Sequence, residues 1–345
     1  MDSANRFVTQ GKILVPKSGK SQLRMTRLSD DAMRATDVLL QRLFGDGNQI
    51  FALLDGNRIP NLPELLDGST LDHACLFQGL LAENAGDAAP WIVQLDPTAK
   101  LARQLLTERG GNSNPIAFWA AHPGIYLRGQ MTLDHLRRHL RRFLRVEDLA
   151  GKAYFFRFWE PDMAATYFAA LNDRPELVER WFHTREGVRI DALVIPGVKP
   201  VTDERPPELI VFEPLDLPDE PEPPTGAFTL NAEDVERFRQ VILHRDIDAI
   251  IQRVETHFPE ITEKVTGERF YRTARQTLSR MMEHGFSQKS NLLTLLVWEF
   301  YFGPQFESRD PEGKLDTILL SDADEAERFE SIRARLEELN LPEQI

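Results

Sequence analysis

The chain has 345 residues, of which 42% are hydrophobic and 28% are charged, and its formal net charge is -13. This length allows one large domain or two ordinary ones, each with a hydrophobic core. The excess of acidic residues argues against a general surface for nucleic acid or anionic membrane, because such a surface needs Lys and Arg in excess.

Cysteine usage and hydropathy favour a protein that is made and kept in the cytoplasm. Cys75 is the only cysteine, so neither a disulfide framework nor a thiol-rich zinc site can form within one chain. The N-terminal residues contain no continuous apolar segment of the kind found in secretory signals. The most apolar stretch, 292–302, has eleven residues, whereas a helix needs about 20 to cross a bilayer.

Short apolar runs alternate with helical patterns in the first part of the chain. Strands are predicted at 49–55, 91–96, 115–121, 153–160 and 208–213. Helices are predicted between them, at 31–44, 98–109, 132–146 and 161–171. Continuous apolar strands separated by helices are typical of a parallel sheet covered on both faces. We therefore expect a flexible N-terminal segment over 1–30, followed by an α/β domain over 31–212 with a mostly parallel sheet covered by helices.

The composition changes sharply after this domain. Residues 213–226 contain five prolines and five acids, which cannot form a core and predict an acidic, Pro-rich linker over 213–228. The rest of the chain, 229–345, has helical periodicity throughout and predicts an all-α lobe. Its segment 292–302 is apolar on every side, which places that helix at the centre of the bundle.

Acidic residues end four of the predicted strands, at Asp55, Asp96, Glu160 and Glu213. In a parallel sheet these ends would share one edge, where α/β folds place their ligands. Carboxylates gathered there could hold Mg²⁺ for phosphoryl transfer. The alternative is structural, because acids also cap the helices that follow strands. No phosphate-binding or nucleophile motif accompanies them, so we expect neither a metal nor another cofactor.

Arginines are concentrated on one face of the helix predicted at 132–146. They are Arg137, Arg138, Arg141, Arg142 and Arg145. In an acidic protein this face could dock an acidic partner surface or the chain's own acidic linker. A solvated charged face is the other interpretation.

Three consecutive aromatic residues end the apolar helix of the C-terminal lobe. Phe300, Tyr301 and Phe302 exceed what a small bundle needs to bury. Burial under another helix is one interpretation, and an apolar groove for a partner segment is the other.

The segment AYFFRFWEPDMAATYF, 153–168, raises the question of whether its aromatic residues bind something or build the fold. Alternation along a strand would make both faces apolar, as expected for a central strand covered by helices. Arg157 is the exception, because a buried guanidinium needs a carboxylate or several carbonyl groups. Asp55 or Asp96 on a neighbouring strand could supply it. We expect Arg157 to form an internal tie.

The sequence resembles a known bacterial family in FALLDG, LF at 76–77, WIVQLDP, HLRRFLRV and AYFFRFWEPDM. The family was first catalogued only as a domain of unknown function, and its typical strand–turn is roughly F-F-R-[FW]-[YW]-[DE]-P. That pattern falls here on Phe155, Phe156, Arg157, Phe158, Trp159, Glu160 and Pro161. The resemblance covers about 50–185, and EHGFS and FGPQFE resemble the C-terminal half of such proteins. Glu160 stands where Asp is commoner.

Members of that family act as adaptor chaperones for type VI secretion effectors. The resemblance implies a non-catalytic protein that holds a toxin effector in the cytoplasm and passes it to the secretion spike protein, without binding nucleic acid or membrane. Asp55, Arg157, Trp159, Glu160 and Pro161 would be structural motif residues. Two alternatives stay open: a metal-dependent phosphoryl-transfer enzyme using Asp55 and Asp96, and a scaffold that binds an acidic protein through its arginine face.

Overall fold

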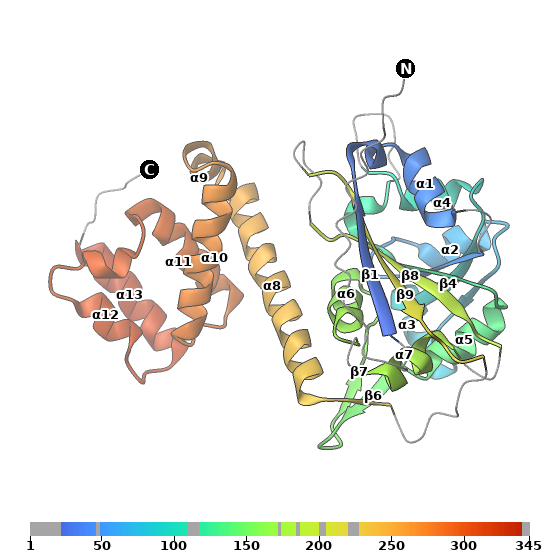
Figure 1. The fold of residues 1–345 in the computed structure, drawn as a ribbon. Helices are drawn as coiled ribbons and strands as arrows, with labels where there is room; N and C mark the ends of the chain where they lie inside the picture. The colour runs from blue at the N-terminus through green and yellow to red at the C-terminus, as the bar shows by residue number, and fades with distance from the viewer. Residues whose placement is uncertain are drawn as a thin grey trace. The chain divides into compact units, whose positions relative to one another are not determined.

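The chain divides into two units, Met1–Phe238 and Arg239–Ile345, in a computed structural model (Figure 1). The structure describes residues 22–45, 49–108, 117–171, 174–183, 187–199, 205–219 and 228–339. Residues 1–21 of the expected N-terminal segment and residues 220–227 of the expected linker lie outside these ranges.

A seven-stranded sheet runs through the first unit in the order β1-β9-β8-β5-β2-β4-β3. The strands are β1 (Gln22–Ser29), β2 (Ile50–Asp55), β3 (His73–Cys75), β4 (Pro90–Leu95), β5 (Gly124–Gly129), β8 (Ile190–Pro196) and β9 (Glu208–Leu215). Every neighbouring pair is antiparallel. The expected mostly parallel sheet is therefore wrong. All six residues of β2 are buried. Its continuous apolar run therefore indicates that both faces of the strand are covered, and it does not indicate the direction of the strand.

Three of the predicted strands coincide with members of this sheet, namely β2, β4 and β9. The strand predicted at 115–121 is wrong, because Trp119–Ala121 form a 3₁₀ helix and β5 follows it. Gly124 begins β5 so close to β2 that a Cβ there would lie 1.9 Å from the carbonyl oxygen of Leu53. The close approach of the two backbones therefore requires glycine at this position.

Helices cover both faces of the sheet. One face packs on α1 (Thr36–Phe44), α2 (Leu62–Asp67) and α4 (Lys100–Leu105), and the other on α5 (Leu133–Arg141), α6 (Pro161–Ala169) and α7 (Pro175–Phe182). The pleat of β2 divides its side chains between them: Ala52 and Leu54 join the first core, and Leu53 joins the second. A short helix, α3 (Leu80–Ala85), buries none of its residues.

A second, three-stranded sheet has the order β10-β6-β7. The hairpin β6 (Arg145–Asp148) and β7 (Ala153–Phe155) is antiparallel, and β10 (Thr229–Leu230) runs parallel to β6. The strand expected at 153–160 is therefore wrong beyond Phe155, and it belongs to this small sheet and not to the centre of the large one. An aromatic cluster lies beside it, in which Phe143 and Trp181 stack with ring centroids 3.6 Å apart.

The long helix α8 (Ala232–His257) begins in the first unit. Arg174 donates two hydrogen bonds of 2.7 Å to the buried carboxylate of Asp234. The ring of Phe238 stacks on Phe156 with centroids 5.1 Å apart. The first two turns of α8 are thus part of the core of the first unit.

The second unit consists of helices and turns over its described residues, 239–339, as expected for the C-terminal part. Beyond α8 the helices are α9 (Pro259–Lys264), α10 (Gly267–Glu283), α11 (Lys289–Phe302), α12 (Lys314–Leu319) and α13 (Glu325–Leu339). Leu292, Leu295 and Leu296 of α11 are completely buried. In the described ranges, no helix has the length and hydropathy that a membrane crossing requires.

Candidate functional site

Arg157 ties the motif segment to the large sheet. It lies in the turn between β7 and α6, not on a central strand as expected. Its guanidinium donates to Asp55 Oδ2 at 2.9 Å and to Glu160 Oε1. The side chains of Asp55 and Glu160 are only 2% and 7% exposed, compared with 35% for Arg157. Of the two expected partners, Asp55 and Asp96, the structure pairs Arg157 with Asp55.

Local sequence positions both carboxylates for this tie. Glu160 occupies the N-cap position of α6, and Pro161 is the first residue of that helix, where its fixed φ is favoured. Asp55 ends β2, where its Oδ1 accepts a hydrogen bond from the Asn57 amide at 3.0 Å. Trp159 is fully buried. The guanidinium of Arg157 lies 5.4 Å from the centroid of the Trp159 ring, a cation–π contact that helps to orient it.

The acids that end the predicted strands do not share one edge. Because β2 and β4 are antiparallel, Asp55 lies beside the start of β4, whereas Asp96 follows its end. Asp96 accepts hydrogen bonds from the hydroxyl and amide of Thr98, which lower the pKa of its carboxyl. Glu213 pairs with Arg24 at 2.7 Å. Within the described ranges, no group of three or more His, Cys, Asp or Glu side chains could hold a metal ion. The alternative in which these four acids gather at one edge of the sheet is therefore wrong.

The arginine face of α5 divides into two sides. Arg137 and Arg141, four residues apart, lie on one side of the helix. Arg142 lies on the opposite flank, and Arg138 lies between, three residues from Arg141. Arg137 Nε donates to the carbonyl oxygen of Cys75 in β3 at 2.7 Å. Arg142 instead contacts His139 Nδ1 at 2.6 Å. The helix expected at 132–146 ends at Arg141, and Arg145 lies in β6, so the expected helix is wrong at its end and Arg145 is not on this face. The rest of the predicted face is partly engaged with the fold.

His139 is a buried member of α5 that the sequence analysis missed as a core residue. Its Nε2 lies 2.7 Å from the carbonyl oxygen of Trp181, so this nitrogen carries the proton and Nδ1 accepts from Arg142. Burial lowers the pKa of His139 to about 3, which keeps the ring neutral. Its place between Leu136 and Leu140 on the apolar stripe is the sequence signal that could have revealed this.

Arg145 and Phe155 stand opposite each other on the outer face of the β6–β7 hairpin. The Phe155 side chain is 46% exposed. Its ring contacts Phe77, with centroids 5.4 Å apart, and Trp159, at 5.7 Å. Phe77 follows Cys75, the residue whose carbonyl oxygen binds Arg137. Through Phe77, these contacts link the motif segment to the side of α5 that carries Arg137 and contacts β3.

Two leucines extend this region. Leu80 and Leu81 begin α3, directly after the turn that follows Phe77, and they are 74% and 49% exposed. We call the whole region the Phe155 surface. It consists of Leu80, Leu81, Arg137, Arg141, Arg145 and Phe155, together with the ring of Phe77, which is only 6% exposed and contacts Phe155.

The aromatic residues at the end of α11 lie in or against the core of the second unit. Phe300 is 5% exposed and stacks on Phe270, with centroids 5.1 Å apart. Tyr301 and Phe302 are half-buried against the same core. The Tyr301 hydroxyl donates to Glu260 at 2.6 Å. Their placement agrees with the interpretation of core residues.

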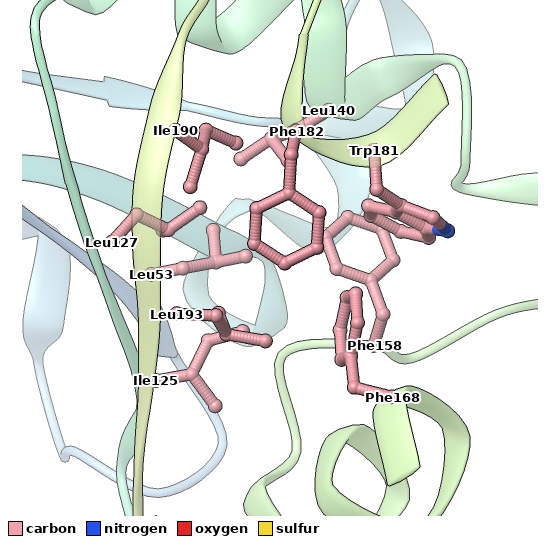
Figure 2. A pocket seen from close by; sticks show the side chains of 10 residues that line it. All are labelled: Leu53, Ile125, Leu127, Leu140, Phe158, Phe168, Trp181, Phe182, Ile190 and Leu193. Carbon is pink, nitrogen blue, oxygen red and sulfur yellow. The ribbon is translucent and has the colours of Figure 1, made fainter. Parts of the chain in front are cut away.

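A small cavity lies between the large sheet and α5, α6 and α7 (Figure 2). Figure 2 shows the Phe182 ring pointing toward leucine and isoleucine side chains of the sheet, with Phe158 and Trp181 beside it. The cavity measures about 10 Å³ and its lining is apolar, so it is at the limit for a single water and offers that water no partner. It is an interstice of the core and not a ligand site.

The first unit is thus an antiparallel sheet between two helical layers. Its described residues include an exposed surface of apolar and basic side chains, and the Arg157 ion pairs lie beside that surface. A protein-family model described as a domain of unknown function (DUF4123) matches residues 50–176, a little over a third of the chain. The match includes Asp55, the Phe155 surface and the motif segment through Pro161. No curated protein and no solved structure matches the chain.

Proposed function

We propose that this protein is a non-catalytic adaptor chaperone. It binds a secreted toxin effector in the cytoplasm and helps to load it onto the spike protein of the type VI secretion system. The observation that carries this proposal is the domain match over residues 50–176, because this domain is associated with type VI secretion effectors. The motif F-F-R-F-W-E-P lies inside the matched segment.

The roles of the motif residues support a binding protein. Arg157 forms ion pairs with both Asp55 and Glu160, so the charged motif residues hold the α6 segment on the sheet. The same segment carries Phe155 to the surface. A motif that secures the fold while exposing an aromatic side chain suits protein recognition, since exposed aromatic residues and arginines dominate many interfaces.

The two-unit organisation also supports an adaptor. Each unit has its own hydrophobic core, so each can present a surface to a different partner. An adaptor that passes cargo to a spike needs at least two such contacts.

Co-purification tests the proposal. The full chain is expressed with the effector and the spike protein encoded beside it, and the mixture is analysed by affinity capture and light scattering. We expect a complex with the effector, the spike or both, at defined stoichiometry. If neither protein associates with the chain under conditions in which all three are folded, the adaptor proposal is wrong.

A further inference from the structure

The Phe155 surface combines exposed apolar side chains with neighbouring arginines. Leu80, Leu81 and Phe155 are among the most exposed large hydrophobic residues in the described ranges. Leu80 and Leu81 lie on a helix, α3, that buries no residue of its own. Scattered single apolar residues are common on protein surfaces, but a group beside a basic stripe is typical of an interaction site.

The arginines of this surface carry charge that the described chain does not neutralise. No ion pair joins Arg137, Arg141 or Arg145 to a carboxylate of the described residues. Arg141 Nε is buried without a hydrogen-bond partner there. Burial, together with the charge of Arg137, lowers the pKa of Arg141. An incoming carboxylate would therefore relieve the like-charge repulsion between Arg137 and Arg141.

Acidic residues of the same region do not remove this charge. Glu147 shares the outer face of the hairpin with Arg145 and Phe155, since alternate strand residues face the same way. Asp134 lies in the first turn of α5. Glu83 lies on α3, and Asp148 ends β6, where it accepts hydrogen bonds from the amides of Ala150 and Lys152. None of these carboxylates forms an ion pair with Arg137, Arg141 or Arg145 among the described residues, so the three guanidinium groups remain available to a partner.

We infer that the Phe155 surface docks an acidic, amphipathic segment of a protein partner. The apolar side of that segment packs on Phe155, Leu80 and Leu81, and its carboxylates face Arg141 and Arg145. The inference rests on the proposed function and deepens it, because it names the chemistry by which the first unit recognises the effector or the spike.

Charge favours this occupant over a second copy of the chain or a membrane. In a symmetric dimer through the same patch, Arg145 would face the basic patch of its twin, because the two surfaces are identical. An anionic lipid surface attracts proteins through larger clusters of Lys and Arg than these three arginines, and it repels the acidic remainder of the chain. An acidic protein segment complements the surface without either cost.

Substitutions on this surface, each with a matched control, test the inference. The full chain carries Phe155→Ser, the pair Leu80→Ser and Leu81→Ser, or Arg145→Glu. Arg272→Glu, at an arginine of the second unit that is 66% exposed, is the charge control. Leu320→Ser, at a leucine of the second unit that is 72% exposed, is the apolar control. Dissociation constants for the effector and for the spike are measured by calorimetry at two salt concentrations.

The expected result is a selective loss. Each surface variant weakens binding of one partner by about tenfold or more, as is typical of residues at the centre of an interface. The wild-type affinity falls with added salt, and Arg145→Glu reduces that dependence. The two control variants bind within about twofold of wild type, because they lie outside the surface.

Cys75 supplies a second readout, because it is the only thiol in the chain and lies beside Arg137. Burial raises the pKa of the Cys75 thiol, so its alkylation by N-ethylmaleimide is followed by mass at mildly alkaline pH. A bound partner is expected to slow this reaction. The controls should show the same protection as wild type.

The possible failures can be told apart. If wild type binds neither effector nor spike, the proposed function itself is wrong. If wild type binds a partner but the surface variants bind equally and Cys75 stays unprotected, the adaptor function stands and this surface is not the docking site. A wild-type dimer that Phe155→Ser dissociates, or binding to phosphatidylglycerol vesicles that Arg145→Glu abolishes, would also overturn the inference.

Discussion

Each unit of this protein contains an arginine that bridges two almost buried carboxylates, but the surroundings differ. Arg157 performs this role in the first unit and Arg280 in the second. Their partners are Asp55 and Glu160 for the former, and Glu299 and Glu307 for the latter. In both pairs the carboxylate side chains are 2% and 7% exposed. The two ties are therefore matched in burial and in charge.

The difference lies in what each tie supports. Arg280 of α10 joins α11 to the turn that follows it, within the core of the helical unit. Arg157 instead lies in the turn after β7, two residues from Phe155, whose side chain is 46% exposed. An arginine that bridges two carboxylates thus stabilises the core of the second unit, and in the first unit it holds a candidate interface in position. Loss of the tie should cost stability in both units but should change binding only in the first.

The largest expected effect comes from removing the arginines. Arg157→Ala and Arg280→Ala each remove the arginine that bridges two buried carboxylates, which costs about 3–5 kcal/mol of unfolding free energy. Urea unfolding combined with hydrogen exchange of peptides from each unit checks this. We expect Arg157→Ala to unfold the first unit and Arg280→Ala the second.

A surface ion pair provides the control for these variants. Arg24 pairs with Glu213 at the edge of the sheet, and its side chain is 54% exposed. Arg24→Ala should cost less than about 1 kcal/mol. A stable Arg157→Ala protein that has lost only partner binding would show that Arg157 is a contact residue and not a tie.

A somewhat smaller effect distinguishes the two aromatic candidates. Phe300→Ala removes a ring buried against Phe270 and should destabilise the second unit by about 3 kcal/mol. Phe155→Ala removes a half-exposed ring and should change stability by less, while it weakens partner binding. Thermal unfolding and calorimetry on the same two variants check both statements. A normal stability for Phe300→Ala would mean that α11 is not the centre of its bundle.

The smallest effect, about 2 kcal/mol between pH 6 and pH 4.5, is a pH dependence in the first unit. His139 has a folded-state pKa of about 3 because it is buried, whereas an unfolded His has a pKa of about 6.5. Below about pH 6.5 the unfolded chain binds a proton that the fold excludes, so stability falls by about 1.4 kcal/mol per pH unit until the folded-state pKa is reached.

His139→Gln removes this contribution and keeps a donor for the Trp181 carbonyl oxygen. The difference in unfolding free energy between wild type and variant should therefore change with the slope expected for one bound proton, about 1.4 kcal/mol per pH unit, between pH 6 and pH 4.5. Acidic residues contribute equally to both proteins, and the exposed His244→Gln serves as control. Equal pH slopes for wild type and His139→Gln would contradict the burial of the ring.

Some features of the fold and the site follow from local sequence. Pro161 begins α6 because its φ suits the first turn of a helix. The apolar residues of 292–302 predict a central helix, because only full burial tolerates an apolar side all round. Arg157 predicts a carboxylate partner, because a guanidinium cannot enter a core unpaired. Each of these inferences rests on local backbone geometry or on the free-energy cost of an exposed apolar side or an unpaired buried charge, and these apply in any fold.

Other features depend on segments that are distant in the sequence. Strand direction was predicted wrongly because an antiparallel strand between two helical layers shows the same apolar run as a parallel one. The acids Asp55 and Asp96 separate to opposite ends of β2 and β4 for the same reason. The sequence also does not show that Arg145 stands opposite Phe155, because this depends on the register of β6 against β7.

The sequence by itself determined which side chains must be buried, which charge needs a partner and where the C-terminal helices lie. Burial and charge compensation are properties of individual residues and their near neighbours, so they can be read locally. Only the tertiary structure decided strand direction, the division of the arginine face and the joining of Phe77, Phe155 and Arg145 into one surface. These depend on pairing between segments up to about 80 residues apart, which no local pattern specifies.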